Sequence, residues 1–136
     1  MGGETVLGVS GETKETVGAD RRVLLYSYIV GRYVAHRGDT VMAVRQYDAA
    51  TCMWVESHTP KGYTLRVAGQ QEVWFLARER GRVLLSSQPF YWELDPSYNY
   101  YFVRDLDKRL YLRWEHGRWC MSEQSGLQVR PYAVEE

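Results

Sequence analysis

Cysteine is nearly absent from this chain of 136 residues, which contains only Cys52 and Cys120. Their spacing fits neither a metal site nor a disulfide framework, and both lie among apolar neighbours, so we expect two buried, reduced thiols. Net charge is absent as well, because 17 bases balance 17 acids, and no basic field favours nucleic acid as a partner. No apolar run approaches the roughly 18 residues of a transmembrane helix.

The sequence also lacks the linear signatures of catalysis and cofactor binding. It has no Gly-x-Ser-x-Gly, no His-Glu-x-x-His, no phosphate loop and no dinucleotide-binding glycine motif. His36, His58 and His116 fall in predicted turns, where we expect surface positions rather than a shared metal site. Asp105 and Asp107 offer too few oxygens for calcium and are expected in a hairpin loop of balanced charge. We therefore predict a non-enzymatic protein without metal or cofactor.

The start of the chain differs in composition from the rest. It contains five glycines and three Glu-Thr pairs without an apolar period, which predicts a flexible tail over 1–22 and one domain over 23–136. Up to residue 20 there is one base against four acids, so the remaining 16 bases and 13 acids give a charge of +3. The polar start carries no secretory signal, so the expected location is cytoplasmic, with a membrane-peripheral position as the alternative.

Aromatic residues are abundant, with 19 Trp, Tyr or Phe in the chain. Twelve short apolar or aromatic segments follow one another from Val23 onward, separated by Gly, Asp, Pro or charged turns. None keeps the 3.6-residue spacing of an amphipathic helix, and the predicted class is all-β. The predicted strands centre on 23–26, 33–35, 41–44, 53–55, 64–67, 73–76, 83–85, 91–94, 101–103, 110–112, 119–121 and 127–129.

One pattern occurs three times in the chain. An aromatic residue is followed by a polar turn that contains glycine, and an apolar strand begins eight residues after the aromatic. With one strand before and one after each copy, the chain divides into three units of four strands, each about 35–42 residues long. This arithmetic predicts a β-trefoil, with another small antiparallel barrel or a sandwich as the alternative. The repeated pairs are Tyr33 with Val41, Phe75 with Val83, and Tyr111 with Trp119.

The units resemble those of fascin-like trefoils and of the histidine-rich actin-binding trefoil. The match is carried in the first unit by Gly31-Arg32-Tyr33-Val34-Ala35 and Cys52-Met53-Trp54-Val55-Glu56, and in the second by Gly62-Tyr63-Thr64-Leu65 and Phe75-Leu76-Ala77. The third unit, at Arg109-Leu110-Tyr111-Leu112, lacks the leading glycine. The resemblance implies the fold and an actin-type filament as partner. It carries over no binding residue, because the motif concerns the fold.

Candidate binding residues gather in the second half of the chain. Alternate residues of a strand face outward, so exposure is expected among Tyr91, Tyr98, Tyr100 and Trp114. Exposed aromatic rings beside arginine are used by protein interfaces and by sugar-stacking sites, whereas ordinary packing and a solvated charged face are the alternatives. The arginines of the third unit that complete this candidate surface are Arg109, Arg113 and Arg118.

Taken together, these observations predict a module that binds another macromolecule, with an actin-type protein as the favoured partner. A carbohydrate-binding lectin is the second reading, which the exposed aromatics favour and the missing Gln-x-Trp repeat opposes. A membrane-peripheral or surface antigen module is the third. The oligomeric state stays open.

Overall fold

The computed structural model describes residues 21–97, 100–107 and 109–132, and all twelve predicted strands are present in it. Most of the predicted tail lies outside the described residues, and the first strand begins at Arg21. A short 3-10 helix, which the sequence did not predict, precedes the fourth strand. The elements are β1 (Arg21–Ser27), β2 (Arg32–Arg37), β3 (Thr40–Val44), η1 (Tyr47–Ala49), β4 (Met53–Ser57), β5 (Tyr63–Val67), β6 (Phe75–Glu79), β7 (Arg82–Ser86), β8 (Trp92–Ser97), β9 (Tyr100–Asp105), β10 (Tyr111–Glu115), β11 (Arg118–Ser122) and β12 (Leu127–Pro131).

Six strands close into an antiparallel barrel. The strand β1 pairs with β4, β4 with β5, β5 with β8, β8 with β9, β9 with β12, and β12 returns to β1. Each unit contributes its first and fourth strand to this ring. Closure leaves no free barrel edge among these strands, which removes the sites where sheets pair with other chains.

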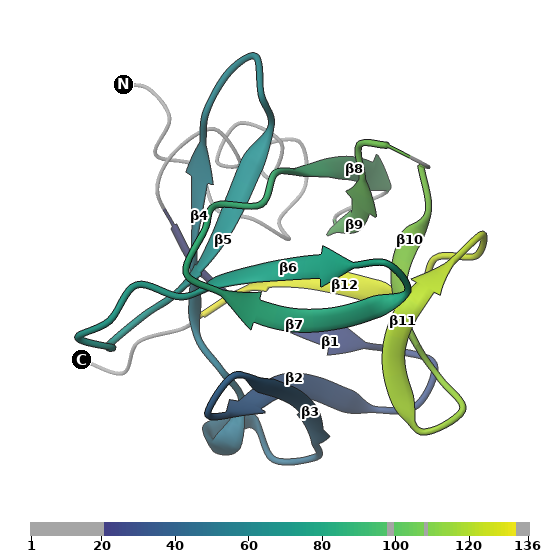
Figure 1. The fold of residues 1–136 in the computed structure, drawn as a ribbon. Coiled ribbons are helices and arrows are strands. Elements are labelled where there is room, and N and C mark those ends of the chain that lie inside the picture. The colour runs from purple at the N-terminus through teal and green to yellow at the C-terminus, as the bar shows by residue number, and fades with distance from the viewer. Residues whose placement is uncertain (1–20, 98–99, 108, 133–136) are drawn as a thin grey trace.

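The second and third strands of each unit form a hairpin, and the three hairpins share one register. Tyr33 lies opposite Val44 in β2–β3, Phe75 opposite Ser86 in β6–β7, and Tyr111 opposite Ser122 in β10–β11. Each partner therefore lies eleven residues after its aromatic, and two residues form each turn. In Figure 1 the hairpins lie at the bottom, the centre and the right of the molecule. The architecture is a β-trefoil, as predicted from the repeat.

The core lies inside the barrel and beneath the hairpins. Along β4, inward residues alternate with partly exposed ones, as Met53 and Val55 do on either side of Trp54. Two tryptophans tie the hairpins to neighbouring elements. The indole Nε1 of Trp92 donates to the carbonyl oxygen of Leu76 over 2.9 Å, and that of Trp119 donates to the carbonyl oxygen of Met42 over 2.8 Å. The second bond joins the third unit to the first.

Two expectations from the sequence need correction. Cys52 and Cys120 are free thiols, but both are half-buried rather than buried: Cys52 directly precedes β4, and Cys120 lies in β11 beside the buried Trp119. Burial still raises the pKa of both thiols. The sixth strand begins at Phe75 instead of Val73, whose side chain is 51% exposed. No helix in the described ranges is long and apolar enough to span a bilayer.

Candidate binding sites

A shallow hollow of about 220 Å³ lies between the second and third units, and we call it the Tyr91 hollow. Tyr91 and Phe90 are half-buried, whereas the side chain of Asp107 is 83% exposed. The ring of Phe90 is already packed against Trp92, with 4.8 Å between ring centroids. Tyr91 is therefore the aromatic group that the hollow can offer to a ligand. The lining residues are Pro89, Phe90, Tyr91, Leu106 and Asp107.

Two residues of the β4–β5 turn contact the ring of Tyr91. The imidazole of His58 meets the Tyr91 ring edge-on at 5.5 Å between centroids, and the ammonium of Lys61 lies 5.6 Å from the centre of the same ring. The Lys61 contact is a cation–π interaction, which favours a fixed ring orientation. Tyr91 is thus oriented by groups from another strand pair before any ligand arrives.

A part-buried polar network fixes His58 in turn. Nε2 of His58 lies 3.0 Å from the hydroxyl oxygen of Thr64, and that hydroxyl donates to the Glu56 carboxylate over 3.4 Å. Because the Thr64 proton goes to Glu56, the Thr64 oxygen accepts from His58. Two hydrogen bonds from Arg66 lower the pKa of the Glu56 carboxyl, against the opposing effect of burial. The carboxylate at the end of the network is therefore kept charged.

The turn that carries His58 and Lys61 depends on Gly62. A Cβ atom at this position would lie 2.7 Å from the backbone carbonyl oxygen of Trp92, and its φ of +119° is accessible to glycine alone. We expect Gly62→Ala to lower the free energy of unfolding by roughly 2–3 kcal/mol, measured by urea denaturation. Gly38→Ala is the matched control, because its φ is +61° with no atom within 4 Å, and it should cost about 1 kcal/mol. Equal losses for the two variants would contradict the clash.

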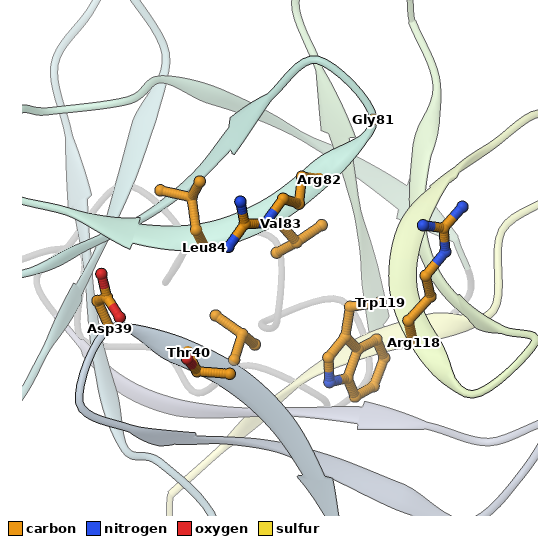
Figure 2. A pocket seen from close by; sticks show the side chains of 9 residues that line it. Asp39, Thr40, Gly81, Arg82, Val83, Leu84, Arg118 and Trp119 are labelled. Carbon is orange, nitrogen blue, oxygen red and sulfur yellow. The ribbon is translucent and has the colours of Figure 1, made fainter.

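A second pocket, of about 260 Å³, lies where the three hairpins meet, and we call it the axial pocket. It is lined by the first two residues of β3, β7 and β11, which occupy the same place in each unit. The first of each pair is polar and exposed, whereas the second is apolar and partly or fully buried. Figure 2 shows this arrangement. The lining residues are Asp39, Thr40, Val41, Gly81, Arg82, Val83, Leu84, Arg118 and Trp119.

The candidate residues chosen from the sequence divide between these places. Tyr91 lies in its hollow, and Arg118 lines the axial pocket, with Trp114 packed against Trp119 at 5.0 Å between centroids. Arg113 forms an ion pair with Glu115 at 2.9 Å, and Arg109 is exposed in a turn with a φ of +59°. Tyr98 and the side chain of Tyr100 lie outside the described residues. The candidates do not form one continuous surface.

Several pocket residues were missed by the sequence analysis. Asp39, Thr40 and Arg82 line the axial pocket, and Asp107 lines the Tyr91 hollow. The sequence does contain a signal for the axial pocket. When the three repeats are aligned, Thr40, Arg82 and Arg118 occupy equivalent positions, each directly before the apolar residue that begins the strand pattern. In the part of the chain that the structure describes, no three His, Cys, Asp or Glu side chains are grouped to hold a metal ion.

Comparisons with known proteins identify structural neighbours only. No family model matches the chain, and no curated protein matches it in sequence. A complex of lysenin with phosphocholine superposes with a TM-score of 0.67 and 6% identity over 88% of this chain and 47% of that one. SeviL bound to asialo-GM1 saccharide superposes with a TM-score of 0.63 and 15% identity over 86% of this chain and 100% of that one. This chain thus spans about half the length of the lysenin chain.

At sequence identities of 6% and 15%, these structures show that the fold is shared, and no functional property is transferred from them to this chain. They agree with the trefoil part of the resemblance stated above, and neither is a fascin-like protein. Neither supports an actin-type partner or a cytoplasmic location. One of the two neighbours is a saccharide complex.

Proposed function

We propose that the chain is a non-enzymatic carbohydrate-binding module that holds a sugar ring in the Tyr91 hollow. The observation that carries this proposal is the half-buried Tyr91 ring beside the exposed carboxylate of Asp107, at a place where two units meet. The saccharide complex of SeviL, which shares the fold along its whole length, supports it.

The chemistry of the hollow matches the two-sided character of a sugar. One face of a pyranose ring presents C–H groups that pack against an aromatic ring, while its rim presents hydroxyl groups that need polar partners. Tyr91, Pro89 and Leu106 offer the apolar contact. Asp107 offers acceptors for the hydroxyl groups. A shallow, open site of this kind suits a sugar at the end of a glycan chain.

Tyr91→Ala should weaken glycan binding at least about tenfold, because it removes the aromatic contact that anchors the sugar. Tyr91→Phe should keep most of the affinity, since the ring remains. A glycan array, followed by calorimetric titration with the best ligand and with the asialo-GM1 saccharide, measures the change.

Tyr28→Ala is the control for this experiment. Tyr28 is 44% exposed on the β1–β2 turn, so its loss removes a comparable surface ring without touching the hollow. Binding by Tyr91→Ala equal to that of the unmodified chain would overturn the assignment of the hollow. Absence of binding to every glycan on the array would overturn the function itself.

A further inference from the structure

The axial pocket presents two arginines that have no partner of their own. Arg82 and Arg118 are exposed, and neither forms an ion pair or side-chain hydrogen bond with another residue in the described ranges. Four other arginines of the chain do form ion pairs: Arg66 with Glu56, Arg78 with Asp105, Arg104 with Glu93 and Arg113 with Glu115. In contrast to these four, the guanidinium groups of Arg82 and Arg118 are available to a ligand, although each lies opposite a glutamate of its own hairpin, Glu79 and Glu115.

These arginines come from different units and reach the pocket at separate points. Each is the first residue of its hairpin's second strand, Arg82 in β7 and Arg118 in β11, and the equivalent residue of β3 is Thr40. In Figure 2 the two guanidinium groups lie well apart, with Arg82 between Asp39 and Arg118. The pocket thus offers two separate cationic contacts, and the two arginines do not converge on a single anionic group.

The other lining residues determine which kind of ligand fits between Arg82 and Arg118. Its floor is formed by Val41, Val83 and Trp119, which cannot hydrogen-bond to a ligand, because the indole N–H of Trp119 is already donated to Met42. Thr40 and Asp39 lie at the rim, where they can accept hydrogen bonds from hydroxyl groups. The occupant that fits has a compact body with hydroxyl groups and oxyanions at two ends.

We propose that the axial pocket binds a small polyhydroxy ring compound that carries two phosphate or sulfate groups, one facing Arg82 and the other Arg118. Guanidinium groups match the oxygens of phosphate and sulfate with paired N–H donors, and these charge-assisted bonds are stronger than neutral ones. This site shares no residue with the Tyr91 hollow, so it can be tested independently of the glycan-binding function.

The test compares three ligands with the same sugar body: glucose 1,6-bisphosphate, glucose 6-phosphate and glucose. In calorimetric titrations at about 50 mM salt, the bisphosphate should bind at least about tenfold more tightly than the monophosphate, and this advantage should shrink at 300 mM salt. Glucose disulfate, as a further ligand, distinguishes phosphate from sulfate as the source of the oxyanions. Equal affinities for the bisphosphate and the monophosphate, or no binding of any charged ligand, would overturn the proposal.

Variants assign the effect to the pocket. Arg82→Ala and Arg118→Ala should each reduce bisphosphate affinity about tenfold, to the level of the monophosphate, while Asp39→Asn should raise it by removing a repelling charge. Arg80→Asn is the control, because it removes a positive charge from the same turn without lining the pocket and keeps a residue type that tolerates the φ of +60°. Tyr91→Ala should leave bisphosphate binding unchanged. If Arg80→Asn lowered bisphosphate affinity as much as the pocket variants do, net charge alone would explain the effect. That result would contradict the site.

Discussion

Replacing Asp105 by alanine is expected to lower the free energy of unfolding by about 3–5 kcal/mol, as measured by urea denaturation. The Asp105 side chain is 1% exposed and its Oδ2 lies 2.9 Å from Nε of Arg78, whose own side chain is 10% exposed. Asp105 also accepts a hydrogen bond from the backbone N–H of Leu110 over 3.1 Å. Its removal leaves the buried Arg78 guanidinium with only the exposed Asp107 nearby, which costs far more than the loss of an exposed pair.

Two further variants make this result interpretable. Asp107→Asn is the matched control, because Asp107 approaches the same arginine at 3.7 Å but its side chain is 83% exposed, so the expected loss is below about 0.5 kcal/mol. The double variant Arg78→Met with Asp105→Leu removes both charges and should recover much of the stability. A loss of less than about 1 kcal/mol in Asp105→Ala would contradict the burial of the pair.

Replacing Trp92 by alanine should also cost about 3–5 kcal/mol, because the side chain is fully buried in the core and its removal leaves a large cavity. The substitution further leaves the carbonyl oxygen of Leu76 without the indole donor. Trp92→Phe separates these contributions, since it keeps most of the volume and should cost about 1–3 kcal/mol. Chemical denaturation followed by far-UV circular dichroism measures both variants.

Trp54→Ala serves as the comparison for Trp92. Trp54 is half-buried on the outer side of β4, with the Arg22 guanidinium 5.6 Å from its ring centroid. Because this indole leaves no internal cavity when it is removed, we expect a loss of about 1 kcal/mol. If Trp54→Ala destabilised the protein as much as Trp92→Ala, the two faces of the barrel strands would have been assigned incorrectly.

The fold could be predicted from the sequence because the spacing within the repeat reflects how the two strands of each hairpin pair. The spacing of eight positions from Tyr33 to Val41, also found from Phe75 to Val83, places a two-residue turn at the same point of each of these hairpins. Register and turn length are local properties, so sequence spacing reports them directly. The 3-10 helix Tyr47–Ala49 was missed because three residues carry no periodic signal.

The sites could be predicted less well, because they depend on contacts between units. Asp105 and Asp107 look alike in the sequence, yet one is buried against Arg78 and the other is exposed. The expected loop of balanced charge is therefore wrong for Asp105, which belongs to the end of β9. The axial pocket likewise joins Asp39, Arg82 and Arg118, which no linear motif brings together. Only the alignment of the three units could have suggested their convergence.

The pairing that closes the barrel has a consequence for how the protein is made. The strand β1 runs beside β12, with Val23 opposite Pro131 and Ser27 opposite Leu127, so the first strand of this fold to be synthesised pairs with the last one. Until β12 has emerged from the ribosome, the edge of β1 that it covers, along the buried Leu24 and Leu25, has no partner strand. Such an edge is a template for association with other chains, and chaperone protection during translation matters most in this interval.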